Sequence, residues 1–94
     1  MKHAGPLAWT IEYDPRAIDD INLLSRDIRR EIVRYLETRI AAADSPRLHG
    51  KPLRHELAGL WRYRVRDYRI VCQIRDETLI VLVVGVGHRR DVYR

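Results

Sequence analysis

The chain has 94 residues, enough for one compact domain spanning residues 1–94, and an apolar share of 46% excludes an intrinsically disordered protein. Cys72 is its single cysteine, which excludes an intrachain disulfide and a cysteine-based metal site, and no apolar run is long enough to span a membrane, so we expect a cytoplasmic protein. The net charge of +5 is uneven, −1 over residues 1–46 and +6 over residues 47–94, so the second half suits an anionic partner.

The first half of the chain predicts one strand followed by two helices. Residues 9–13 alternate and are rich in β-formers, which predicts a strand. Asp14 then has the position of an N-cap, with Pro15 in the first helical turn. Ser25 is predicted to cap a longer helix that ends before Pro46. Its apolar stripe repeats every four residues, at Ile28, Ile32, Leu36 and Ile40.

From residue 61 the pattern changes to the two-residue period of β-strands. Residues 61–65 alternate strictly, and residues 68–75 continue after a two-residue turn at residues 66–67. A hairpin of this kind places Arg64 opposite Arg69, on the face that points away from the apolar side chains.

The remaining segments complete the expected fold. Residues 47–60 predict a loop with one helical turn. Residues 79–86 are apolar on both faces, which predicts an interior strand that is covered on both sides. The predicted order is β-α-α-β-β-β. We therefore expect an α+β fold in which a helical hairpin packs on a mostly antiparallel four-stranded sheet.

Arginine side chains gather on the predicted outer face of this hairpin. Arg62, Arg64 and Arg69 share that face, and guanidinium groups so close together repel one another unless an anion lies among them. The segment after the last strand offers further groups that could reach the rim of the same face: His88, Arg89, Arg90 and Tyr93. Such a set can bind phosphates and stack on a base, as single-stranded RNA requires. The alternative is a solvated charged face, neutralised by acids from elsewhere in the chain.

Histidine is the acid–base candidate, because imidazole titrates near neutrality, and His88 has the best position for that role. His49 and His55 could approach the same groove, although loop histidines are more often ordinary surface residues. The four histidines form no helical i, i+4 pair and no acidic cluster offers an oxygen cage, so we expect neither a metal nor a cofactor. A nuclease of this composition would stabilise the reacting phosphate with arginine.

Two segments, LHGKPLRHELAGLWRYRVRDYRIVCQI and GVGHRRDVYR, resemble the RelE branch of the RelE/ParE toxin superfamily. The resemblance covers the whole predicted order of elements and is most specific over residues 48–94, where Cys72 replaces a common aromatic. It implies an endoribonuclease that enters the ribosomal A site and cuts mRNA without a metal, through attack of the ribose 2′-hydroxyl on the adjacent phosphate. It also implies a RelB-like antitoxin, through which alone the toxin would meet DNA.

The same resemblance implies roles for individual residues. Those that match the family's catalytic set are Arg62, Arg64, Arg69, Arg89 and Tyr93, to which we add His88 as a candidate proton carrier. The candidate RNA-binding residues are His49, Lys51 and Arg90.

This sequence departs from the family's pattern in two ways. The strand pair is often Lys-x-Lys, whereas here it is Arg62 and Arg64, and arginine does not give up its proton. If a strand lysine is the base in the family, that role would pass to His88 or Tyr93 here, or the arginines would act only electrostatically. The sequence also ends one residue after Tyr93, without the C-terminal helix of some relatives.

Two other functions fit the same predicted scaffold. A ParE-like toxin would inhibit DNA gyrase by binding, without nuclease activity, although ParE members generally lack the full set of basic residues and tyrosine kept here. The third alternative is an inactive relative that binds RNA or regulates its own operon.

Overall fold

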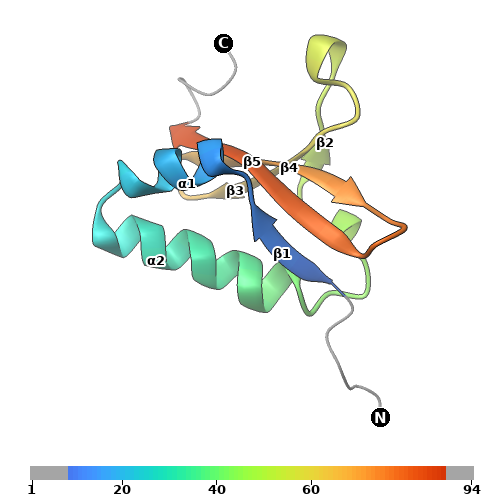
Figure 1. Cartoon of the computed structure of the whole chain (residues 1–94), viewed down its shortest axis with the longest axis horizontal. Coiled ribbons are helices and arrows are strands. Elements are labelled where there is room, and N and C mark those ends of the chain that lie inside the picture. The colour runs from blue at the N-terminus through green and yellow to red at the C-terminus, as the bar shows by residue number, and fades with distance from the viewer. Residues whose placement is uncertain (1–8, 89–94) are drawn as a thin grey trace.

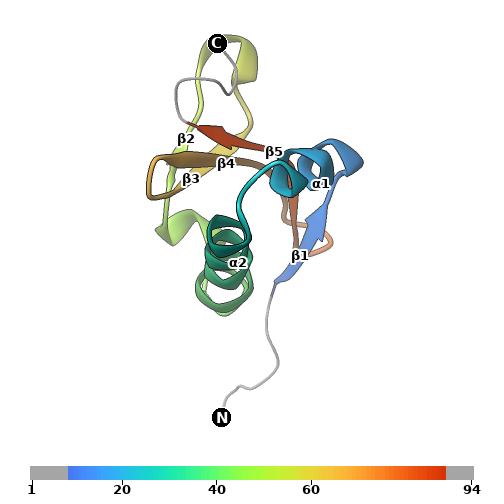
Figure 2. The same cartoon turned by 90° about the vertical axis from the view of Figure 1, so that its left-hand side faces the viewer.

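A five-stranded sheet carries the helical hairpin on one face, with α2 beneath the sheet and α1 beside the edge of β5 (Figures 1 and 2). The structure is a computed structural model and describes residues 9–88. The strands are β1 (Thr10–Tyr13), β2 (Lys51–Pro52), β3 (Trp61–Val65), β4 (Tyr68–Arg75) and β5 (Ile80–His88). Their spatial order is β1-β5-β4-β3-β2, with β1 parallel to β5 and the other pairs antiparallel.

The helices begin where the sequence predicts them. They are α1 (Pro15–Asn22) and α2 (Arg26–Arg34), and α2 continues into a π-helical segment, η1 (Tyr35–Ile40). The Asp14 carboxylate accepts a hydrogen bond from the Arg16 backbone N–H at 2.9 Å, and the Ser25 hydroxyl accepts one from Ile28 N–H at 3.4 Å. Both predicted N-caps are therefore confirmed. Two 3₁₀ turns follow, η2 (Pro46–Leu48) and η3 (His55–Leu57).

The α+β prediction is confirmed, with two differences in the sheet. The sheet has five strands rather than four, because the two-residue strand β2 adds to its edge and is too short to show a sequence pattern. The last strand is interior as predicted, between β1 and β4. Val81 and Val83 are buried on its helix side, but Ile80 and Leu82 on the other side are only half-buried. The prediction that both faces of this strand are covered was therefore wrong.

The hydrophobic core lies between the helices and the inner face of the sheet. Tyr63 of β3 lies opposite Ile70 of β4, in the predicted hairpin register, and both are fully buried. Removing such side chains from water is the main favourable contribution to folding, roughly 25 cal/mol per Å² of apolar surface. The sheet contributes Tyr63, Val65, Ile70, Cys72, Val81 and Val83 to this core, and the helical layer contributes Ala17, Ile21, Ile32, Leu36 and Ile40.

Helix α1 protects the edge of β5 beyond the point where β1 ends. The pairing of β1 with β5 stops at Tyr13 opposite Val83. Further along, the Asp20 carboxylate accepts a hydrogen bond from the Val86 backbone N–H at 3.0 Å. A side chain of α1 therefore takes the place of a neighbouring strand and satisfies a donor on the sheet edge.

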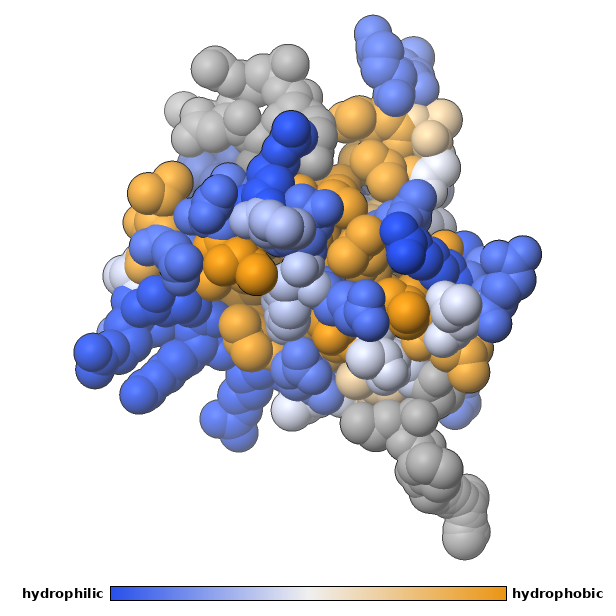
Figure 3. Space-filling view, in the orientation of Figure 1, coloured by the Kyte–Doolittle hydropathy of each residue, from blue (hydrophilic) through white to orange (hydrophobic). Residues whose placement is uncertain are grey.

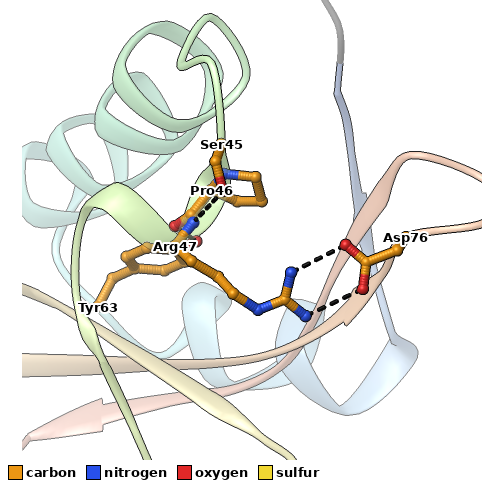
Figure 4. A network of polar contacts seen from close by, with 5 residues as sticks. All are labelled: Ser45, Pro46, Arg47, Tyr63 and Asp76. Carbon is orange, nitrogen blue, oxygen red and sulfur yellow. Dashed lines mark hydrogen bonds and ion pairs between the residues drawn. The ribbon is translucent and has the colours of Figure 1, made fainter.

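The segment between η1 and β3 is fastened to the sheet by hydrogen bonds from β3. Tyr63 Oη donates to the Pro46 carbonyl at 2.7 Å, and Trp61 Nε1 donates to the His49 carbonyl at 2.7 Å. Arg47 forms a bidentate ion pair with Asp76 at 2.8 and 3.0 Å (Figure 4). These contacts fix the path of the chain that leads into β2.

Gly50 is required where this segment passes over β3. Its φ is +75°, and a Cβ at this position would collide with the Arg62 carbonyl oxygen and lie 2.8 Å from Trp61 Nε1. Gly59 also has a positive φ, +98°, but a Cβ there would meet nothing within 4 Å. A side chain at either glycine would therefore strain the backbone, but only a side chain at Gly50 would also collide with neighbouring atoms.

We predict that Gly50→Ala lowers the free energy of unfolding by about 2–4 kcal/mol, because strain and overpacking add. Gly59→Ala serves as the control and should cost only about 1 kcal/mol, from backbone strain alone. Urea denaturation of both variants measures the difference. Equal losses in the two variants would contradict the steric argument.

Cys72 provides a second test of the core. Its side chain is fully buried in the core between the sheet and the helices, and burial raises the pKa of the thiol. We predict that an aromatic disulfide reagent at pH 8 leaves the native protein unlabelled and modifies it once urea unfolds the chain. Rapid labelling in the absence of denaturant would mean that β4 is not packed as described.

Candidate functional site

The outer side of the sheet, away from the helices, carries a cluster of cations that we call the basic face: Lys51 of β2, Arg62 and Arg64 of β3, and Arg69 of β4. Lys51 lies opposite Arg62, and Arg64 lies opposite Arg69. Because side chains alternate along a strand, the burial of Tyr63 on the inner face directs its neighbours Arg62 and Arg64 outward. The structure therefore brings together the three arginines that the sequence predicted on one face.

A groove of about 350 Å³ lies along this face. Arg62 and Arg69 form its wall on the sheet, and Lys51 and Arg54 approach from the segment that begins at β2, together with Pro52 and Leu53. That segment rises on the outer side of the sheet (Figure 2). Arg54 was not predicted as a site residue, because the irregular chain between β2 and β3 has no periodic pattern that would orient its side chain.

The electrostatics of the groove favour the binding of an anion. Burial lowers the pKa of Arg62, and the neighbouring charges of Arg69 and Arg64 lower it further. The Nε atom of Arg69 is buried and has no hydrogen-bond partner in the part of the chain that the structure describes. A buried donor without an acceptor costs about 1–3 kcal/mol, and a phosphate oxygen would satisfy it.

Acids that could neutralise the basic face are not found at contact distance within residues 9–88. The ion pairs there join Arg47 to Asp76 and Arg66 to Glu31. Arg66 lies in the β3–β4 turn, and its Nε contacts Glu31 of α2 at 2.7 Å. The two acids that form ion pairs within residues 9–88 therefore engage arginines outside the basic face, which disfavours the alternative of a neutralised, solvated surface.

Two glycines of β5 lie beside the basic face. Gly85 lies opposite Val71 and Gly87 lies opposite Arg69. Paired residues share a face, so β5 presents no side chain beside Arg69 at these positions. A register shift at residues 71–72 sets Val83 opposite Cys72 and leaves Val84 without a cross-strand partner. This bulge re-aims the end of β5.

His88 does not join the basic face. It ends β5 opposite Tyr68, and the two rings meet edge to face with their centroids 5.8 Å apart. Alternation from Gly87 places His88 on the helix side of the sheet, so the expectation that it reaches the rim near Arg69 was wrong. The strand continues two residues further than predicted, and its pleat sets the direction of this side chain.

The other predicted site residues have mixed positions. Lys51 lies in the groove. His49 is half-buried and holds the loop through its backbone carbonyl, and it is not among the residues that line the groove. His55 is exposed in η3. The remaining predicted residues lie outside the described chain: Arg89, Arg90 and Tyr93.

The described residues contain neither a cluster of metal ligands nor a membrane-spanning helix. Between residues 9 and 88, histidine, cysteine and acidic side chains form no group of three or more that could hold a metal ion. The helices described there are also too short and too polar to cross a bilayer.

Comparisons with known proteins agree with this arrangement. Residues 11–93 match the family model described as ParE toxin of type II toxin-antitoxin system, parDE. Toxin RelG of Mycobacterium tuberculosis is 33% identical over 88 residues, which cover 94% of this chain and 99% of RelG. The mRNA interferase toxin RelE of Escherichia coli K12 is 29% identical over 91 residues, which cover 93% and 92% of the two chains.

Solved structures show the same fold. A chain in the crystal structure of the toxin–antitoxin complex RelBE2 from M. tuberculosis superposes with a TM-score of 0.80 at 32% identity, over 88% of this chain and 93% of that chain. An E. coli RelE mutant in complex with an antitoxin RelBc peptide superposes with a TM-score of 0.70 at 27% identity, over 87% of this chain and 84% of that chain. The chain therefore belongs to the RelE/ParE toxin superfamily and is a RelE-type toxin of a type II toxin–antitoxin system.

Proposed function

We propose that this toxin is a metal-independent endoribonuclease that cuts mRNA in the ribosomal A site. The observation that carries the proposal is the buried Nε of Arg69, which has no hydrogen-bond partner among residues 9–88, in a groove shared with Arg62, whose pKa is lowered by burial and by like charge. An anionic phosphate in this groove would relieve both unfavourable conditions. The name mRNA interferase carried by the E. coli relative supports RNA as the substrate.

The proposed reaction is an internal phosphoryl transfer. The 2′-oxygen forms a bond to the adjacent phosphorus while the bond from phosphorus to the 5′-oxygen breaks, which leaves a 2′,3′-cyclic phosphate and a free 5′-hydroxyl. Negative charge grows on the non-bridging oxygens, where Arg62 and Arg69 would stabilise it. Arg64 and Arg54 would hold the flanking backbone. Arg89 keeps the phosphate-binding role that the family resemblance implies.

Two protons must move in this reaction. Arginine retains its proton, so among the groove residues Lys51 is the one side chain whose neutral form can accept a proton, and we assign that neutral amine as acceptor from the 2′-hydroxyl. For the second proton, we assign the phenol of Tyr93, which matches the family's catalytic tyrosine, as donor to the leaving 5′-oxygen. His88 is not assigned a role, because it lies on the helix side of the sheet.

The partners follow from the same proposal. The ribosome would supply mRNA in its A site, so the toxin would act in the cytoplasm and inhibit translation. A RelB-like antitoxin would neutralise it, since structural relatives are described as RelBE complexes. Mapping of mRNA cut sites with and without ribosomes, with analysis of the new ends, tests the function directly. Cuts that need the ribosome and end in a cyclic phosphate are expected.

Inhibition of DNA gyrase by binding is the second candidate function, favoured by the ParE description of the matching family model. A supercoiling assay with purified gyrase separates the two candidates. Inhibition of supercoiling, without any cut in ribosome-bound mRNA, would overturn the nuclease proposal.

Arg62→Ala and Arg69→Ala should each lower kcat for mRNA cleavage about 10²–10³-fold, because each removes a donor to the developing phosphate charge. Arg75→Ala is the matched control, since Arg75 lies on the same strand as Arg69 but does not line the groove. Its cleavage rate should remain within about threefold of the wild type. Wild-type rates in both groove variants, with unchanged unfolding midpoints, would defeat the assignment.

Lys51→Arg tests the proton acceptor. The charge stays but the proton can no longer be exchanged, so kcat should fall about 10²-fold or more while the affinity for single-stranded RNA stays near that of the wild type. Lys51→Met should weaken RNA binding as well. Full activity of the arginine variant would show that Lys51 only binds RNA.

A further inference from the structure

A second cationic surface lies on the other side of the molecule. Its residues line a shallow hollow of about 510 Å³ on α2, and we call it the arginine stripe: Arg26, Arg29, Arg30, Arg34 and Val33. Hydrophilic side chains project together from the surface over the start of this helix (Figure 3). In Figure 2, α2 lies beneath the sheet and the segment that begins at β2 rises above it, so the arginine stripe belongs to the layer opposite the groove.

The arginine stripe has no evident benefit for stability. Arg26, Arg30 and Arg34 follow one another at i, i+4 spacing, where like charges destabilise a helix by about 0.2–0.5 kcal/mol per pair. The first helical turns also disfavour positive charge, because the helix dipole is positive there. Neutral residues or an acid at Arg26 and Arg30 would avoid these costs.

Few groups within residues 9–88 compensate these charges. Arg29 contacts the Asn22 side-chain oxygen at 3.4 Å, a neutral partner at the limit of hydrogen bonding. The helix carries two acids, Asp27 and Glu31, and Glu31 is engaged by Arg66. The ion pairs described in this part of the chain include none of the four arginines. Within residues 9–88, these guanidinium groups therefore remain available to an external anion.

We propose that the arginine stripe binds the phosphate backbone of base-paired RNA. Successive arginines at i, i+4 are separated by about 6 Å along the helix axis, which gives evenly spaced guanidinium forks suited to the regular phosphates of one strand. The lining residues are four arginines and one valine, so they offer charge without an aromatic surface for stacking unpaired bases. Duplex RNA is recognised in this way, through its backbone and shape.

The two surfaces would then divide the recognition of RNA. The arginine stripe would hold a structured RNA while the groove receives a single strand, and neither would obstruct the other because the sheet separates them. The inference rests on the proposed function only in taking RNA as the ligand, because a duplex can be bound without being cleaved. Under that function, the structured RNA would be the ribosomal RNA around the A site.

The test uses a hairpin RNA with a 16-base-pair stem, the span of a typical duplex-binding domain, and a single-stranded octanucleotide as a second probe. The variant is the triple substitution Arg26→Gln, Arg30→Gln and Arg34→Gln, because glutamine keeps good helix propensity. Fluorescence anisotropy should show at least a tenfold loss of affinity for the hairpin. The slope of the logarithm of hairpin affinity against the logarithm of salt concentration should become shallower by about two to three. The affinity for the octanucleotide should be unchanged.

A matched control removes three charges elsewhere. The residues are Arg16, Arg39 and Arg75, which are exposed and lie outside both the stripe and the groove, and they are replaced by glutamine. The control should lose no more than about threefold in hairpin affinity, through its lower net charge. Equal losses in the two triple variants would overturn the proposal, because binding would then depend on net charge alone.

Two further outcomes would also overturn it. Loss of hairpin binding in Arg69→Ala, with the stripe variant unaffected, would assign the duplex to the basic face. Tighter binding of an acidic amphipathic peptide than of the hairpin to the stripe would identify a protein-docking surface instead. In ribosome assays the stripe variant should raise KM and leave kcat unchanged. Hairpin binding at the stripe without any mRNA cleavage would refute the nuclease function and leave this inference standing.

Discussion

The site depends on one constraint, the burial of the inner face of the β3–β4 hairpin. Tyr63 and Ile70 lie opposite each other with no exposed surface, and turning either strand over would expose both side chains to water. The same pleat then forces Arg64 and Arg69 into direct opposition on the outer face. The hydrophobic core thus contributes the free energy that holds mutually repelling guanidinium groups together.

The second wall of the groove depends on β3 as well. Trp61 and Tyr63 are core-side residues whose polar ends donate to carbonyls of the chain that precedes β2. Buried Tyr and Trp side chains need such partners, and here the partners are the backbone of the segment that carries Lys51 and Arg54. The strand β3 therefore supplies Arg62 to the groove from its outer face and fixes the opposing wall through its inner face.

Residue patterns predicted the hairpin, its register and both helix starts, because each depends on local periodicity or on a single capping side chain. The two-residue strand β2 and the groove residue Arg54 could not be predicted, since tertiary hydrogen bonds, not periodicity, place them. His88 was misplaced for a related reason. The sequence suggested that the strand ends at residue 86, and a side chain in an irregular tail has no fixed direction, whereas in β5 the pleat sets one.

The parallel pairing of β1 with β5 also constrains when the molecule can form. It joins Thr10 to Ile80, near the two ends of the described chain, and closing so long a loop is slow because most of its entropy is lost before the contact forms. During synthesis, β1 has no strand partner until β5 has left the ribosome. Helix α1, which packs against β5, lacks its main support over the same interval. The nascent chain is thus unable to assemble the complete sheet until β5 has emerged from the ribosome.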